Sequence, residues 1–258
     1  MNASIRRYGL GVLGIVVALT VWQLLVTGPL ATKPFATVPA IGRALRTFAG
    51  EASFWQSLGQ TLEVALLGLL LSVVVGLALG VVVGLSDTAY RSLRLVTEFL
   101  KPIPPIVILP LLVLVLGPTP RMGVFLVFFG GVFILMTQTA NGVADLDPVA
   151  AETARSYRLT RRQRVLQLIV PTALPFVATG VRITAAAALV IALVSEIVGG
   201  APGLGKDMVL AQLSGSYDQI YALVVVFGLL GMLLNGILGF AERRLLFWHA
   251  SVRTEVSP

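Results

Sequence analysis

The stretch GAPGLGKD, residues 200–207, has the glycine and lysine spacing of a loop that binds nucleotide phosphates. In such a loop the backbone amides and the lysine hold the phosphates, and a serine or threonine after the lysine binds Mg²⁺. Here Asp207 follows Lys206 and supplies a carboxylate in place of that hydroxyl. A phosphate loop also needs a strand before it and a helix after it whose N-terminus faces the phosphates. The elements around residues 200–207 therefore decide whether they bind a nucleotide.

The composition indicates that lipid is the solvent for most of the chain. Hydrophobic residues make up 57% of the 258 positions, only 12% are charged, and the mean hydropathy is +0.93, far outside the range of soluble domains. The sequence has no cysteine, which excludes disulfides, thiolate metal sites and cysteine nucleophiles. The apolar segments hold only isolated charges, which argues against an intramembrane enzyme with clustered catalytic groups.

Six apolar segments are long enough to cross a bilayer, which takes roughly 20 helical residues. They are residues 8–27, 58–85, 99–117, 122–142, 173–198 and 220–240. The sequence therefore predicts an all-α integral membrane protein, a single domain of six transmembrane helices. A cleaved signal peptide is the alternative for the first segment, but its apolar part is long and no convincing cleavage site follows it.

Two of these segments carry patterns that affect helix packing. The second predicted span has small-xxx-small spacing, which allows close helix contact, through glycines at 68, 76, 80 and 84. The third is interrupted by Pro102, Pro104, Pro105 and Pro110, which predict a kinked or broken helix. Backbone carbonyls freed by proline are tolerated at membrane depth against neighbouring helices or a water-lined cavity. The third span is therefore interpreted either as a wall of a transport pathway or as a kinked packing helix.

The positive charges predict the orientation of the chain. Thirteen Lys and Arg residues, Lys101 and Arg253 among them, fall in segments that six spans starting inside place in the cytoplasm, and five fall outside; Arg182 is intramembrane. This bias is the one expected when both termini are cytoplasmic. Lys206 then lies in an external loop after a membrane helix, with no strand before it. Residues 200–207 are accordingly predicted to end one helix and turn the chain, not to bind a nucleotide.

The one long polar segment between spans, residues 147–171, is predicted to form two short helices. Asp147 precedes a proline, and this pair predicts a helix start because the carboxylate accepts hydrogen bonds from free backbone amides. Thr160 and Gln163 have the spacing of a capping box that starts a second helix. That helix is expected to be interrupted by two prolines, Pro171 and Pro175.

Three interpretations of this helix–turn–helix segment stay open on the residues alone. It can be a solvated loop whose arginines only fix the topology. It can bind DNA through RRQR, although a unit of this size tethered to the bilayer at both ends could hardly reach a major groove. It can be a rigid knob that docks a cytosolic partner.

The same segment, ETARSYRLTRRQRVLQLIVPTALP, resembles a known family: the permease subunits of binding-protein-dependent ABC importers, in the branch that handles sulfonates, taurine and nitrate. The family signature is E-A-A, three residues, glycine, nine residues, and then an apolar pattern ending in proline. Glu152, Ala154 and Pro171 match it, whereas Arg158 stands at the glycine position. The resemblance extends to LKPIPPIVILPLLVLVLG, GVRI and PGLG, and so covers most of residues 57–245.

The resemblance implies a transport mechanism and a set of partners. Two ATP-binding cassette subunits, which use ATP and Mg²⁺, would grip a cytoplasmic coupling helix between the fourth and fifth spans. An external or periplasmic binding protein would deliver the solute, a second permease copy would complete the pathway, and this chain would bind no cofactor, metal or nucleic acid. The protein would reside in the bacterial inner membrane. The residues expected to couple the chain to the ATPase are Glu152, Ala154, Arg155, Tyr157, Arg158 and Pro171.

Three positions carry open questions. At Arg158 either the turn avoids a left-handed backbone, which costs a non-glycine residue about 1–2 kcal/mol, or the strain is tolerated. Arg182, inside the fifth span, either extends to the inner headgroups or faces the pathway, where it would suit an anion. Glu196, near the outer end of that span, is either hydrated at the interface or part of a gate. A passive channel or another non-ABC transporter is the alternative function.

Overall fold

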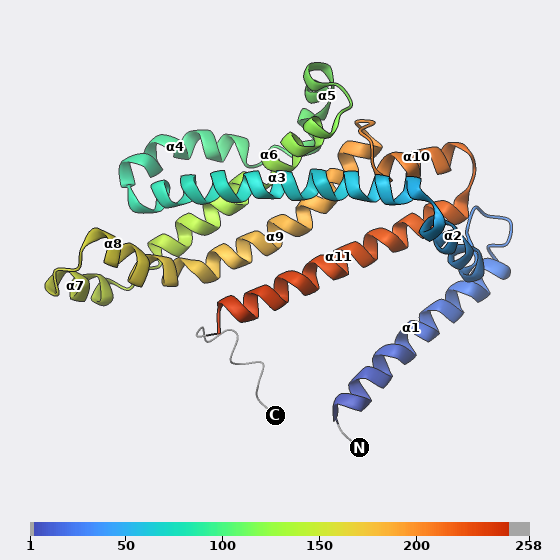
Figure 1. The fold of residues 1–258 in the computed structure, drawn as a ribbon, viewed down its shortest axis with the longest axis horizontal. Helices are drawn as coiled ribbons and strands as arrows, with labels where there is room; N and C mark the ends of the chain where they lie inside the picture. The colour runs from blue at the N-terminus through green and yellow to red at the C-terminus, as the bar shows by residue number, and fades with distance from the viewer. Residues whose placement is uncertain (1–2, 248–258) are drawn as a thin grey trace. The chain divides into compact units, whose positions relative to one another are not determined.

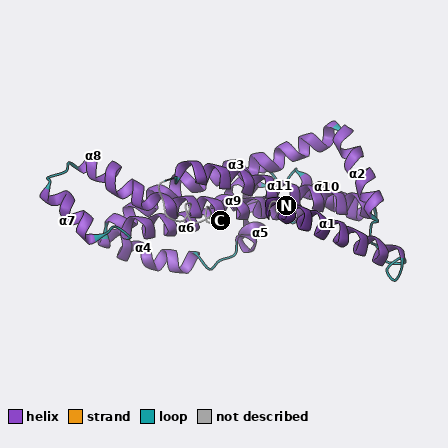
Figure 2. Cartoon of the chain, turned by 90° about the horizontal axis from the view of Figure 1, so that it is seen from below, coloured by secondary structure: helices purple, strands orange, loops and turns teal. Residues whose placement is uncertain are grey.

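The computed structural model describes residues 3–247, and within that range its secondary structure is entirely helical (Figure 1, Figure 2). The predicted all-α membrane fold is confirmed. Arg253, counted above as cytoplasmic, lies outside the described residues. The elements are α1 (Ala3–Thr27), α2 (Val38–Gly50), α3 (Ala52–Leu85), α4 (Asp87–Leu100), α5 (Pro105–Leu116), α6 (Pro120–Ala144), α7 (Pro148–Ser156), α8 (Arg161–Arg164), the π-helical turn η1 (Val165–Ile169), α9 (Val170–Ile197), α10 (Leu204–Leu213) and α11 (Tyr217–Leu245).

Five helical stretches in the described range are long and apolar enough to cross a membrane. They are residues 9–27 of α1, α3, α6, the continuous run from α8 through α9, and α11. The pair α4 and α5 passes the same test if taken as one bent span, which gives up to six crossings. Two compact units contain these helices: residues 58–206 with 230–247 form one, and α1, α2 and residues 207–229 belong to the other.

In the unit that contains α1, aromatic packing and two hydrogen bonds hold the segment between α1 and α2. The Trp22 ring lies 5.7 Å from the ring centroids of both Phe35 and Tyr221. Its indole Nε1–H donates to the backbone oxygen of Ala36 at 3.1 Å, and the Val38 backbone N–H donates to Gln23 Oε1 at 2.9 Å. These contacts fix where α2 begins in a chain that has no disulfide to do so.

In the larger unit, α6 packs against both α3 and α9, and α3 and α9 also meet each other in one apolar cluster. The glycine stripe of α3 faces α6 directly, because side chains at Gly68, Gly76, Gly80 and Gly84 would collide with Val127, Leu135, Thr139 and Val143. On α6, a side chain at Gly142 would lie 2.9 Å from the Ala173 Cα of α9. The close helix contact predicted from small-xxx-small spacing is therefore present, and it builds the core of this unit.

The third predicted span, residues 99–117, is a broken one. The residues between the predicted second and third spans do not form a loop. Most of them belong to α4, which starts where the Ser86 hydroxyl accepts from the Ala89 backbone N–H at 3.3 Å. The chain then turns through 86° before α5. This break follows from Pro102, Pro104 and Pro105, which cannot donate the backbone hydrogen bonds that would continue α4.

The expectation that Pro171 and Pro175 interrupt the helix after Thr160 was wrong. Residues 161–197 form one continuous helical run that passes both prolines. Immediately before Pro171 the run widens into η1, where the Val170 N–H donates to the Val165 oxygen five residues back. A π-turn shifts the hydrogen-bond register, and this allows proline to enter the following α-helix at its first turn, where no amide hydrogen is needed.

Candidate coupling and transport sites

The segment after α6 forms the capped helix predicted from its sequence. The Asp147 carboxylate accepts from the Val149 backbone N–H at 2.9 Å, and Pro148 occupies the first helical position. After α7, the Thr160 hydroxyl accepts from the Gln163 N–H at 3.3 Å while Gln163 Oε1 accepts from the Thr160 N–H at 2.9 Å. This capping box starts the run that leads into α9, so α7 is joined to a membrane-spanning helix by one short turn.

That turn is a left-handed helix C-cap built on Arg158. The Leu159 N–H donates to the Ala154 oxygen at 3.0 Å, and the Arg158 N–H donates to the Arg155 oxygen at 2.9 Å. This pair of bonds is the Schellman pattern. Arg158 has φ of 52°, and among the described residues it alone is a non-glycine residue with positive φ. The turn thus keeps the left-handed conformation that glycine would take, and the strain is tolerated.

The predicted coupling residues divide into an exposed set and a buried set. The side chains of Glu152, Arg155 and Arg158 are exposed, and Tyr157 is 79% exposed. Ala154 is buried, with 4% of its surface accessible, and so belongs to the inner face of α7. Figure 1 shows α7 and α8 at one end of the α6–α9 pair, away from α5. An exposed aromatic ring beside charges of both signs, on a short capped helix, forms a surface that can bind another protein.

The glycine-rich loop after α9 binds an anion, but that anion belongs to the same chain. The Gly205 N–H donates to Glu196 Oε2 at 2.8 Å, and Glu196 is completely buried. A side chain at Gly203, where φ is 149°, would collide with this carboxylate. The amide of a helix N-terminus and the positive end of the α10 dipole stabilise a carboxylate here. Residues 200–207 therefore turn the chain, as predicted, and Glu196 is packed under this turn instead of being hydrated at an interface.

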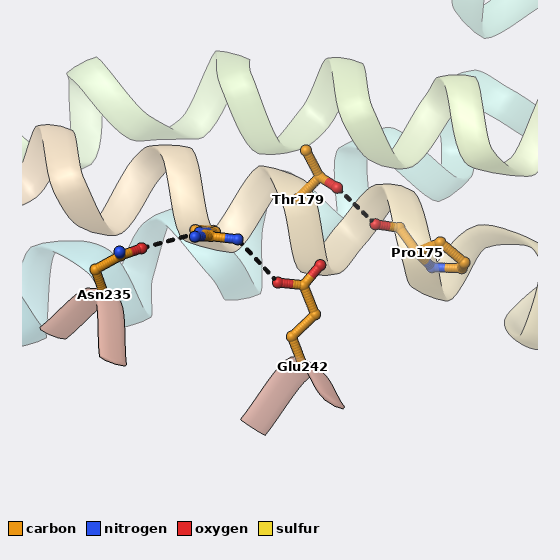
Figure 3. A network of polar contacts seen from close by, with 5 residues as sticks. Pro175, Thr179, Asn235 and Glu242 are labelled. Atoms are coloured by element: carbon orange, nitrogen blue, oxygen red, sulfur yellow. Dashed lines mark hydrogen bonds and ion pairs between the residues drawn. The ribbon is translucent and has the colours of Figure 1, made fainter. Parts of the chain in front are cut away.

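Arg182, expected at the headgroups or in the pathway, contacts α11. Its Nε–H donates to Asn235 Oδ1 at 3.0 Å, and its Nη1 lies 3.4 Å from Glu242 Oε2 (Figure 3). Figure 3 shows Asn235 and Glu242 reaching from α11 toward α9. Arg182 is 49% exposed and Glu242 is 25% exposed. The guanidinium thus links two transmembrane helices, and its charge is partly balanced within the chain.

A cavity of about 440 Å³ lies where the α4–α5 bend meets α6 and α9. Lys101 lines it together with Phe129 and Phe133 from the middle of α6 and Ile183 from α9. Lys101 thus lies at the break of the bent α4–α5 pair, beside the middle of α6. The sequence signal that could have located it is its position directly before the proline cluster, at the break in the third span.

Five or six apolar helical crossings in the described range, a capped helix between two of them and a cavity at a helix break are consistent with a transmembrane transport subunit. The family model for the inner membrane component of binding-protein-dependent transport systems matches residues 72–246, and the chain belongs to this family. The family and its apolar helices make the chain a multi-pass inner-membrane protein.

Relatives in other organisms agree with this family. The chain is 30% identical to the putative aliphatic sulfonates transport permease protein SsuC of Escherichia coli K12, over 89% of this chain and 88% of the relative. It is 29% identical to the E. coli taurine transport system permease protein TauC, with coverage of 96% and 92%. It is 26% identical to the nitrate import permease protein NrtB of Leptolyngbya laminosa, with coverage of 95% and 90%.

Solved structures agree in fold. A chain of the inward-facing MetNI methionine ABC transporter superposes with a TM-score of 0.66 at 19% identity, covering 74% of this chain and 95% of that one. The family and the named relatives support an ABC importer permease over a passive channel.

Proposed function

We propose that this chain is the permease subunit of an ATP-driven importer for a small anion or zwitterion, such as a sulfonate, taurine or nitrate. An external binding protein delivers the solute, and two ATPase subunits, which hold ATP and Mg²⁺, act on a pair of permease copies. The named relatives, which transport or import sulfonates, taurine or nitrate, support this solute class. The permease performs no covalent chemistry in this scheme.

The observation that carries the proposal is the direct helical connection between α7 and the membrane. α7 is fixed at both ends by caps, and the run that follows continues as helix from Arg161 to Ile197. A displacement of α7 by a closing ATPase is therefore passed to α9 along a nearly continuous backbone. Glu152, Arg155 and Tyr157 are the proposed contacts with the ATPase, and both chain termini are placed in the cytoplasm.

Charge reversal on α7 tests this mechanism. We expect Glu152→Lys to lower ATP-dependent uptake at least about tenfold, because truncating or reversing a charged contact at an interface costs roughly 2–5 kcal/mol. The amount of permease in the membrane should stay unchanged, because Glu152 is exposed and supports no core contact. Uptake and co-purification of the ATPase subunit are measured together in membrane vesicles.

The matched control is Glu51→Lys, which makes the same charge change at an exposed glutamate outside α7. This variant should transport as the unmodified chain does. If Glu152→Lys retained both normal uptake and normal ATPase association, α7 would not be the coupling element.

A further inference from the structure

The cavity at the α4–α5 bend has one ionisable group and a largely apolar wall. Lys101 is the charged residue among those lining it in the described part of the chain, and no carboxylate lines it. Within the described residues Lys101 makes no ion pair. A cationic side chain at the depth of a transmembrane helix is costly unless it faces water, a partner or a ligand. The charge on Lys101 is therefore available to a solute in the cavity.

Two further polar groups share the cavity with Lys101. Gln138 carries an amide with two N–H donors, and Thr137 contributes a hydroxyl. The Thr137 hydroxyl hydrogen is used in a bond to the Phe133 backbone oxygen at 2.7 Å, so Thr137 offers only an acceptor. The donors that can reach a solute are thus the Lys101 ammonium and the Gln138 amide. Both favour an anionic group with several acceptor oxygens.

The other ionisable residues expected in the pathway are engaged elsewhere. Arg182 is held by Asn235 and Glu242 of α11, and Glu196 is buried beneath the Gly205 amide. Ile183, the neighbour of Arg182 on α9, lines the cavity, but Arg182 does not. The cation that faces this cavity is therefore Lys101.

The aromatic part of the cavity wall suits an apolar substituent. Phe129 and Phe133 meet edge to face, with ring centroids 5.7 Å apart, and both line the cavity with Ile183. Burying an alkyl chain against such a wall removes apolar surface from water and so favours binding. An inorganic anion such as nitrate would gain nothing from these rings.

The packing around the bend fixes the cavity in place. A side chain at Gly130 of α6 would lie 2.9 Å from Pro105 Cγ, so the first residue of α5 rests directly on the α6 backbone. Lys101 caps the C-terminus of α4, with its N–H donating to the Thr97 oxygen at 2.9 Å. Both sides of the bend are thereby anchored, and the lysine stem extends from a defined backbone position.

We propose that this cavity is an intramembrane binding site for a small organic anion with a short alkyl chain, a sulfonate type, held by Lys101 and Gln138 with its chain against Phe129 and Phe133. The proposal rests on the proposed function, since it assigns the solute class of the same pathway. It places selectivity for the solute in the permease itself and favours alkylsulfonates over nitrate.

Removal of the Lys101 charge tests the anion contact. In the complete importer, with its ATPase subunits and binding protein, Lys101→Gln should lower the initial rate of labelled butanesulfonate uptake about tenfold or more at subsaturating concentration, the usual cost of a lost charged hydrogen bond. Arg91→Gln, which removes one exposed positive charge from the same α4, should stay within about twofold of the unmodified importer. Lys101→Arg should restore part of the rate.

The membrane level of each variant is measured alongside and should stay unchanged, because Lys101 is exposed and makes no ion pair within the described residues. If the unmodified importer takes up butanesulfonate and Lys101→Gln does so at the same rate, the site is wrong while the proposed function stands. If the unmodified importer imports taurine or nitrate but not butanesulfonate, the site is likewise wrong while the proposed function stands. If it uses ATP to import none of butanesulfonate, taurine and nitrate, the proposed function fails, and the proposed site fails with it.

The apolar wall is tested by the ratio of two solutes. Phe133→Ala should reduce uptake of butanesulfonate relative to that of nitrate at least about threefold, since only the alkyl chain contacts the ring. Phe125→Ala removes a ring from the same helix outside the cavity and should leave this ratio unchanged. An equal loss for both solutes in Phe133→Ala would overturn the alkyl contact.

Discussion

At Arg158 the chain holds a left-handed turn without the help of glycine. The turn is forced from both sides, since the Leu159 and Arg158 amides bond back into α7 and the Thr160 capping box begins only two residues later. Two satisfied caps outweigh a backbone penalty of about 1–2 kcal/mol at a single residue. The geometry of α7 and its turn therefore depends on these hydrogen bonds. Arg158 also adds a positive charge that glycine would lack.

Arg158→Gly should stabilise the protein by about 0.5–1 kcal/mol. The substitution removes the left-handed strain, and the greater freedom of glycine in the unfolded chain offsets part of that gain. The measurement is thermal unfolding of the purified permease in detergent. Arg158→Ala is the control, because it removes the same charge but keeps the strain. Equal stabilisation by alanine would show that charge repulsion, not backbone conformation, limits this turn.

At Glu196 the glycine-rich pattern correctly indicates backbone amides that bind an anion, but the anion is a side-chain carboxylate and not a nucleotide phosphate. The glycines at 203 and 205 do bring backbone amides to an anion, as a phosphate loop would. The anion is a carboxylate nine residues earlier on α9, and only the folded helix reveals that it reaches the loop. Sequence spacing alone could exclude the nucleotide, but it could not supply the carboxylate that takes its place.

Among the elements, the contact between α3 and α6 is the most sharply defined by sequence. Four glycines spaced along α3 allow its backbone to meet α6 at the Cβ atoms of Val127, Leu135, Thr139 and Val143. In lipid, where apolar surface gains nothing from leaving water, such close packing is what holds helices together. The glycine stripe is therefore a structural feature rather than part of the pathway.

Gly80→Leu should destabilise this contact by about 1–3 kcal/mol, the usual cost of overpacking a close-fitting core. A Cβ atom at residue 80 would lie 2.7 Å from the Met136 backbone oxygen, so α3 and α6 would have to separate. The measurement is the amount of folded permease that survives heating in detergent. Gly59→Ala on the same helix meets nothing within 4 Å and should be neutral or slightly stabilising. Similar losses in both variants would show that α3 is sensitive to any substitution.

The features that could be predicted from the sequence depend on residues within one element, whereas the missed ones depend on the folded structure. The capped start of α7, the Thr160 capping box and the glycine stripe were predictable because each depends on residues at fixed spacing within one element. The missed features were α4, whose charged stretch was taken as a connection between two apolar spans, and the passage of the helix through Pro171. That passage depends on the π-turn η1, a hydrogen-bond register with no sequence signal of its own. The position of Lys101 in a cavity could not be predicted, because it depends on the 86° bend that follows it.

At the scale of the whole molecule, charge asymmetry supports one orientation. Even if Lys101 is left out of the count, far more Lys and Arg residues lie on the side of the membrane predicted for α7 than on the side predicted for Lys206. The run 161–197 is 37 residues long, about 55 Å at 1.5 Å per residue, and so is more than long enough to cross the bilayer once. The beginning of that run and the loop that follows it must then lie on opposite sides of the membrane.

The absence of cysteine makes this orientation directly measurable, since every label must report the residue that was introduced. Arg162→Cys, at an exposed position of α8, should react with a membrane-impermeant maleimide in inside-out vesicles and not in right-side-out ones. Lys206→Cys, exposed after the glycine-rich loop, should give the opposite pattern. The unmodified chain controls for background labelling. A reversed pattern would place α7 outside the cell, beyond the reach of any ATPase, whereas labelling of both positions from one side would mean that the run does not cross the membrane.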